Sequence, residues 1–143
     1  MGKLTMLDRL FVYGTLRKDV RNSKFQMLEQ EAGEVTFSGT ARIRGWLFQL
    51  GNYPGLVLSD DPGEWVRGEV YVLTRPGETL SRLDDYEGCG PNDTQPYEYE
   101  RVAAEIVLDS GSRERAWVYV YKGSIAGRQE IASGDYGMEE PGS

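Results

Sequence analysis

Three acidic residues stand close together in the segment Leu83-Asp84-Asp85-Tyr86-Glu87-Gly88. The apolar spacing around its start predicts a short helix over residues 80–86, capped at its N-terminus by Thr79. Glu87 then lies at the C-terminal end of this helix, where the helix dipole and the neighbouring acids both disfavour its charged form. We therefore expect its pKa to be raised toward the range of a general acid and base. The alternative is a solvated helix end without chemistry, which is how we interpret Asp84 and Asp85.

The sequence contains no histidine, and this narrows the possible chemistry. Ser-His-Asp and Cys-His catalysis are excluded, as are histidine-ligated metal sites. Acid–base catalysis near neutral pH then falls to carboxylates, lysine, tyrosine or cysteine with shifted pKa values. The single cysteine, Cys89, has no basic neighbour in sequence that would stabilise a thiolate, so we expect it to be inert. Asp60 and Asp61 read as a solvated turn, and no nucleotide-binding motif is present, so we expect neither metal nor cofactor.

A second candidate lies near the N-terminus, where the apolar run from Leu10 ends in Tyr13-Gly14-Thr15-Leu16-Arg17. The run predicts a short buried strand, and a strand that ends in Gly-Thr can direct several backbone N–H groups toward one point. Such a turn could bind a carboxylate or another small anion. An ordinary structural turn is the competing interpretation of the same residues.

These two motifs occur together with four further segments, in an order and at spacings that resemble the γ-glutamylcyclotransferase-like family of small enzymes. The resemblance covers residues 10–136, and its specific part is Tyr13-Gly14-Thr15-Leu16 paired with Leu83-Asp84-Asp85-Tyr86-Glu87-Gly88. The supporting segments are Asn52-Tyr53-Pro54-Gly55-Leu56-Val57, Tyr99-Glu100-Arg101, Ala116-Trp117-Val118-Tyr119-Val120-Tyr121 and Ser133-Gly134-Asp135-Tyr136.

The resemblance implies a role for Glu87 as the catalytic acid–base. It would take a proton from the α-amino group of a γ-glutamyl substrate, whose amine then attacks its own γ-carbonyl and closes a five-membered ring. The products would be 5-oxoproline and a free amine or amino acid. This chemistry needs no enzyme nucleophile, no metal and no cofactor.

The same resemblance implies which residues bind the small-molecule γ-glutamyl substrate. The turn Tyr13-Gly14-Thr15-Leu16 would hold the glutamyl group with its backbone amides, and Arg17 would add charge or simply be exposed. Tyr53 lies in a turn next to the pocket in relatives, and Tyr99 with Arg101 follows the catalytic loop. An ordinary strand pair, one side chain in and one out, remains the alternative for Tyr99 and Arg101.

The elements that must position these residues are mostly strands. Alternating or apolar composition predicts strands near 10–13, 66–73, 97–108 and 113–121, the last two joined by a hairpin at 109–112. Residues 35–50 predict either two strands or one bent strand, residues 51–55 a turn, and residues 22–33 a further helix. The expected fold class is α+β: a small mixed sheet, curled toward a barrel, with two or three short helices packed outside.

Composition sets the remaining expectations. A chain of 143 residues is near the commonest domain size, so we expect one domain with an ordered core over residues 8–136 and flexible termini, and the resemblance implies that this domain is γ-glutamylcyclotransferase-like. A formal charge of −7 argues against a nucleic-acid partner, and no apolar run is long enough to span a membrane. A lone cysteine fits a reducing cytoplasmic setting, and we expect a monomer or weak homodimer. A non-catalytic small-molecule binding or regulatory protein with the same pocket is the alternative to an enzyme.

Overall fold

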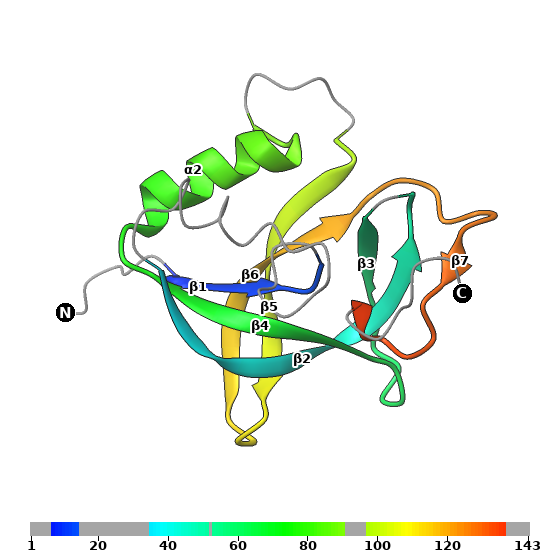
Figure 1. Cartoon of the computed structure of the whole chain (residues 1–143), viewed down its shortest axis with the longest axis horizontal. Helices are drawn as coiled ribbons and strands as arrows, with labels where there is room; N and C mark the ends of the chain where they lie inside the picture. The colour runs from blue at the N-terminus through cyan, green and yellow to red at the C-terminus, as the bar shows by residue number, and fades with distance from the viewer. Residues whose placement is uncertain (1–6, 15–34, 52, 91–96, 137–143) are drawn as a thin grey trace.

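The computed structural model describes residues 7–14, 35–51, 53–90 and 97–136. Five strands pair in the order β2-β4-β1-β6-β5, and β5 pairs again with β2, so the sheet closes into a barrel (Figure 1). Strands β3 and β7 pair with β2 outside this circuit. The elements are β1 (Arg9–Val12), β2 (Val35–Gln49), β3 (Pro54–Leu58), β4 (Trp65–Leu73), α2 (Pro76–Glu87), β5 (Tyr99–Leu108), β6 (Arg113–Tyr121) and β7 (Gln129–Glu130).

The barrel is a mixed sheet, because β1 runs parallel to β6 while the other pairs are antiparallel. The four strands that the sequence predicts most clearly, β1, β4, β5 and β6, are neighbours in this one curled sheet, so the α+β prediction is confirmed. In the described part of the chain α2 is the one helix. The helix predicted over residues 22–33 lies outside the described residues.

Apolar side chains on the two faces of the barrel strands form two separate clusters. Because successive side chains of a strand point to opposite faces, Phe11 joins one cluster and its neighbours Leu10 and Val12 the other. The first cluster fills the barrel: Phe11, Tyr13, Ala41, Ile43, Leu47, Leu56, Val66, Val70, Ile106, Ala116, Val118, Val120 and Ile131. The second lies between the barrel and α2: Leu10, Val12, Leu50, Tyr71, Leu73, Leu80, Leu83, Tyr99 and Tyr119. Burial on both faces explains why β1 is apolar from Leu10 to Val12.

Residues 35–49 form one long strand, β2, which settles the question that the sequence leaves open. β2 pairs with β4 from Val35 to Arg44, with a β-bulge between Phe37 and Gly39, and then with β3 from Gly45 to Gln49. The turn predicted over residues 51–55 is shorter than expected. β3 already begins at Pro54, because a proline is tolerated at the first position of a strand, where no ladder donor is lost.

Helix α2 is longer than predicted, and Thr79 is not its N-cap. The helix begins at Pro76, whose fixed φ suits the first turn, and Arg75 occupies the N-cap position without a side-chain hydrogen bond. Thr79 is buried inside the helix instead. At the other end Gly88 adopts a left-handed conformation with φ 78° and closes the helix. Glu87 is therefore the last helical residue, one position beyond the predicted end of the helix, and it lies at the C-terminal end as expected.

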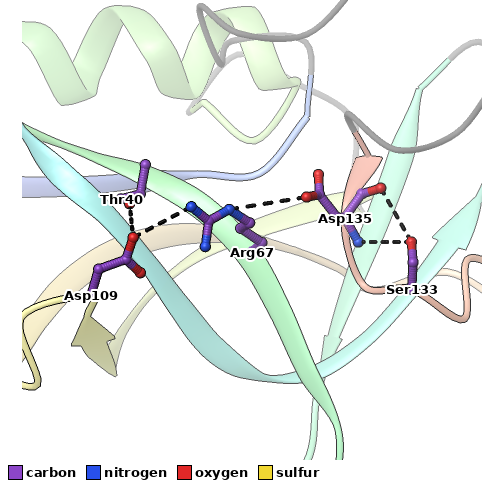
Figure 2. A network of polar contacts seen from close by, with 5 residues as sticks. All are labelled: Thr40, Arg67, Asp109, Ser133 and Asp135. Carbon is purple, nitrogen blue, oxygen red and sulfur yellow. Dashed lines mark hydrogen bonds and ion pairs between the residues drawn. The ribbon is translucent and has the colours of Figure 1, made fainter.

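At the hairpin end of the barrel a polar network fastens the C-terminal segment to the strands (Figure 2). Arg67 of β4 lies 3.3 Å from the Asp109 carboxylate and 4.0 Å from that of Asp135. Thr40 donates a hydrogen bond to Asp109, and Ser133 bonds with the backbone of Asp135. Asp109 lies in the predicted β5–β6 turn, so this Arg67 network lies at the opposite end of that hairpin from Tyr99 and Tyr121.

Among the described residues no helix is long and apolar enough to cross a membrane.

Candidate active site

Glu87 is the one carboxyl group, in the part of the chain that the structure describes, whose pKa is raised into the neutral range. Its pKa rises from an ordinary value of 4.5 to about 7, chiefly because burial at the end of α2 removes water, and further because the Glu98 carboxylate lies nearby. The expected rise is thus found, but its cause is burial and Glu98 rather than the adjacent acids. Among the described residues, none forms a hydrogen bond with the Glu87 carboxylate.

Tyr13 directly follows β1 and lies within electrostatic reach of Glu87. Burial raises the pKa of its phenol, and the negative charge of Glu87 raises it further, so the hydroxyl stays protonated. This hydroxyl donates to the backbone oxygen of Tyr119 at 2.6 Å and accepts from the N–H of Leu56 at 3.2 Å. Tyr13 therefore joins β1, β3 and β6 beneath the predicted substrate turn, and its hydroxyl is already used for that purpose.

Gly14 occupies a position where a side chain does not fit. A Cβ atom built there would lie 2.9 Å from Cγ and 3.1 Å from Cδ of Pro54, a rigid ring at the start of β3. The turn after β1 and the start of β3 are thus in close contact, which brings Gly14 and the Tyr53-Pro54 segment together. The other predicted members of this turn, Thr15, Leu16 and Arg17, lie outside the described residues.

The predicted tyrosines Tyr53 and Tyr99 pack against each other beside this contact, with ring centroids 6.2 Å apart. The Tyr99 hydroxyl donates to the backbone oxygen of Pro54 at 2.8 Å, and the Tyr53 hydroxyl donates to Glu98 Oε1 at 2.8 Å. Glu87 and Glu98 both raise the pKa of Tyr99, after the larger effect of its own burial. Both hydroxyls therefore stabilise the walls of the site, and the proton of each is already used in a hydrogen bond within the protein.

Arg101 is close to the site but its charge is already paired. Its Nε lies 2.8 Å from Asp84 Oδ1 and its second guanidinium nitrogen 3.1 Å from Oδ2, while the guanidinium stacks over Trp117 at 4.4 Å from the ring centroid. Tyr99 and Arg101 both face α2, as residues two apart in a strand do, so the alternative with one side chain in and one out is wrong.

Asp84 is not a solvated helix-end acid, which corrects the expectation from sequence. Besides Arg101, it accepts a hydrogen bond from the Tyr119 hydroxyl at 2.7 Å. Asp85, in contrast, is exposed.

Three residues near the site are not indicated by the sequence. Asp84 and Tyr119 were missed because their contact is recognised only once β5 and β6 are in register with α2. Glu98 was missed because a single exposed glutamate before a strand carries no signal of its own.

The thiol of Cys89 behaves as expected. Burial and the charges of Asp84 and Glu87 raise its pKa to about 11, which keeps it protonated at neutral pH. Among the described residues no group of three acidic, cysteine or histidine side chains is arranged to hold a metal ion. The site is therefore one carboxyl group with a pKa near neutrality, next to a strand-end turn and a wall of tyrosines whose hydroxyls are bonded within the protein.

Comparison with known proteins places the same residues in a recognised family. Residues 10–138 match the family described as "Gamma-glutamyl cyclotransferase, AIG2-like". The chain is 39% identical over 122 residues to a Niallia circulans protein named "Gamma-L-glutamyl-butirosin B gamma-glutamyl cyclotransferase", which covers 84% of this chain and 70% of that protein. It is 34% identical over 129 residues to the "Gamma-glutamylcyclotransferase family protein YtfP" of Escherichia coli K12, covering 90% and 95% of the two chains.

A solved structure supports the same relationship. The crystal structure of an AIG2-like protein from Mus musculus superimposes with a TM-score of 0.72 at 25% identity, over 96% of this chain and 92% of the mouse chain. The barrel and the helix that ends at Glu87 therefore belong to a fold that recurs at low sequence identity.

Proposed function

The chain belongs to the AIG2-like gamma-glutamyl cyclotransferase family, and from this premise we propose that it cyclises the γ-glutamyl group of a γ-glutamyl amine or amino acid. The products are 5-oxoproline and the free amine or amino acid. The observation that carries the proposal is the Glu87 carboxyl group, whose pKa of about 7 lies at the working pH of a general acid–base.

In the proposed mechanism the α-amino group of the bound substrate reacts as the neutral amine. Its lone electron pair attacks the γ-carbonyl carbon, forming the new C–N bond of the five-membered ring, while Glu87, as a carboxylate, takes one of the two protons of the attacking nitrogen. The bond from the γ-carbon to the leaving nitrogen then breaks, and Glu87 returns its proton to that nitrogen. Atoms and charge balance over the cycle, and at its end Glu87 is again a carboxylate.

The role of the remaining residues is to hold the substrate bent. Well-oriented intramolecular reactions recover about 7–11 kcal/mol of barrier, so a site that folds the glutamyl chain onto itself needs no nucleophile of its own. We assign this task to the backbone amides of the turn that begins at Tyr13 and Gly14, which would be fixed in place by the contacts with Pro54 and Leu56. Tyr53 and Tyr99 form the adjoining wall.

A panel of γ-glutamyl compounds tests the proposal. The purified protein is incubated with γ-glutamyl amines, γ-glutamyl amino acids and γ-glutamyl-butirosin B, the last because of the name of the Niallia circulans relative. We expect 5-oxoproline by mass spectrometry with at least one of them, and none from the Glu87→Gln variant. Thermal stabilisation by a panel member without any product would instead support a binding or regulatory protein that uses the same pocket.

A further inference from the structure

We propose that Asp84 is a positioning residue that acts through Arg101 and Tyr119 to hold the Glu87 carboxylate at its working place. The inference rests on the proposed function of Glu87, since it concerns how that carboxylate is kept where a substrate can reach it.

The geometry at Asp84 is that of a clamp on the last turn of α2. Its carboxylate accepts two hydrogen bonds from Arg101, at 2.8 and 3.1 Å, and one from Tyr119 at 2.7 Å. Its backbone oxygen accepts the N–H of Cys89 at 2.9 Å, which closes the helix. Glu87 follows three residues later, so Asp84 lies one helical turn before it on the same side of α2. Fixing the Asp84 side chain therefore fixes the turn that carries Glu87.

The clamp comes from two strands at one point. Arg101 of β5 and Tyr119 of β6 are directly opposite each other in the ladder, so their side chains rise from the same place on the barrel toward α2. α2 has no basic residue in its last turn, and an acid there is unfavourable next to the negative end of the helix dipole. The guanidinium of Arg101 supplies the missing positive charge.

Tyr119 also connects the clamp to the substrate turn. Its hydroxyl binds Asp84 of α2, while its backbone oxygen accepts the hydrogen bond from Tyr13, the residue that directly follows β1. The end of α2 and the end of β1 are thus both attached to one residue of β6. Because Glu87 belongs to the first and the turn at Gly14 to the second, this attachment sets the position of the carboxylate relative to the substrate.

The test compares Asp84→Asn with Asp85→Asn. Each variant removes one negative charge from the same turn of α2, but the Asp85 side chain is exposed, and no described residue forms an ion pair with it. We expect Asp84→Asn to release the end of α2 so that water reaches Glu87. Its pKa, measured by ¹³C NMR of the carboxyl group and assigned with Glu87→Gln, should fall from about 7 toward 4.5, and Asp85→Asn should leave it in place. With a substrate from the panel, kcat should fall by about 10²-fold, with a much smaller change in KM.

The structural alternative is that Asp84 stabilises the fold and nothing more. In that case Asp84→Asn lowers the melting temperature but leaves the pKa of Glu87 and the kcat of the folded protein unchanged, and the proposal is overturned. An equal pKa shift in Asp85→Asn would also overturn it. Should Asp84→Asn fail to fold, Tyr119→Phe removes a single hydrogen bond and keeps the ring; a smaller pKa shift in the same direction supports the clamp, and no shift contradicts it.

The pKa measurement needs no substrate, so it separates this inference from the proposed function. A protein in which Asp84→Asn shifts the Glu87 pKa, yet in which no γ-glutamyl compound is cyclised, keeps the clamp and loses the proposed reaction.

Discussion

Two arginine-centred networks hold the barrel of this protein at different places, and they differ mainly in their access to water. In the first, Arg101 binds Asp84, and the two side chains are 21% and 18% exposed. In the second, Arg67 binds Asp109 (Figure 2). These two side chains are 45% and 51% exposed. An ion pair in water contributes about 0–1 kcal/mol, whereas a partly buried and multiply bonded pair is screened less and holds its geometry better.

The two networks also differ in what they hold. The Asp84 network fastens the end of α2, and with it the carboxyl group that the proposed reaction needs. The Arg67 network fastens the C-terminal segment at Ser133 and Asp135, where no predicted site residue lies. If the proposals hold, similar charged groups position a reacting carboxyl group in the first network and provide only local attachment in the second.

The largest expected effect is that of Glu87→Gln. The substitution preserves size but removes the ability to accept a proton, so kcat on a genuine substrate should fall by about 10²–10⁴-fold, the usual contribution of general acid–base catalysis. KM should change far less, because the backbone turn that binds the glutamyl group is untouched. Steady-state kinetics on any substrate from the panel measures both, and a kcat near that of the wild type would remove Glu87 from the mechanism.

Glu87→Gln is also expected to make the folded protein more stable than the wild type above neutral pH. The folded protein keeps the proton of Glu87 over the range from about pH 4.5 to 7, in which the unfolded chain has lost it. The contribution of protonated Glu87 to the free energy of unfolding is therefore fully present below pH 4.5 and is lost as the pH rises through 7. Denaturant unfolding at pH 4 and pH 8 should show Glu87→Gln gaining free energy of unfolding relative to the wild type at the higher pH. If the difference in free energy of unfolding between the variant and the wild type does not change with pH, burial does not destabilise the charged form of Glu87.

Gly14→Ala is expected to have the next largest effect. Its methyl group would meet the Pro54 ring at 2.9 Å, and neither partner can turn away, so the free energy of unfolding should fall by about 1–3 kcal/mol and kcat/KM should fall with it. Gly63→Ala serves as the control, because its Cβ would meet only Asp61 at 3.5 Å. Equal stability of the two variants in urea denaturation would contradict the close contact.

A smaller effect is expected from Glu98→Gln. Removing this charge lowers the pKa of Glu87, since Glu98 raises it at present, so the base is deprotonated at lower pH. The acid limb of the pH profile of kcat/KM should move to lower pH. The move should be smaller than the full rise of the Glu87 pKa from 4.5 to about 7, because burial contributes more to that rise than Glu98 does. Glu100→Gln removes the same charge two residues away, from an ion pair with Lys122, and should leave the limb in place.

The smallest effect is expected at the exposed network. Asp109→Asn should cost at most about 1 kcal/mol and leave turnover unchanged. The hydrogen bond from Thr40, followed by the charge of Arg67, lowers the pKa of Asp109 below its ordinary 3.8. Its contribution is therefore present above that value and lost as the pH falls further, so the difference from the wild type should disappear in acid. A kcat loss in Asp109→Asn would erase the contrast between the two networks.

The sequence predicts local features of this protein well. Alternation in β4 and the Ser-Gly turn between β5 and β6 indicate structure over a few residues, and both are confirmed. The end of the helix is predicted at residue 86 and lies one residue later, at Glu87. The sequence misplaces the start of α2, because Thr79 is a good N-cap residue but Pro76 and burial of Thr79 decide the boundary.

What the sequence does not predict is contact between distant strands. Asp84, Arg101 and Tyr119 meet only because β5 and β6 pair in one register and α2 lies over both, which no spacing along the chain reveals. The start of β3 at Pro54 is missed for the same reason, since its pairing with Gln49 is what makes it a strand. The raised pKa of Glu87 is anticipated, but from the wrong neighbours, because Glu98 comes from another segment.

The most direct test is to measure one pKa of Glu87 in two ways on the wild-type protein. The carboxyl ¹³C signal of Glu87 gives its pKa by NMR titration, and the acid limb of kcat/KM for an active γ-glutamyl substrate gives the pKa of the essential base in the free enzyme. If Glu87 is that base, both values should lie at about 7, and the Glu87→Gln variant should lack the limb. A carboxyl signal that titrates near 4.5 while the acid limb stays near 7 would show that another group takes the proton.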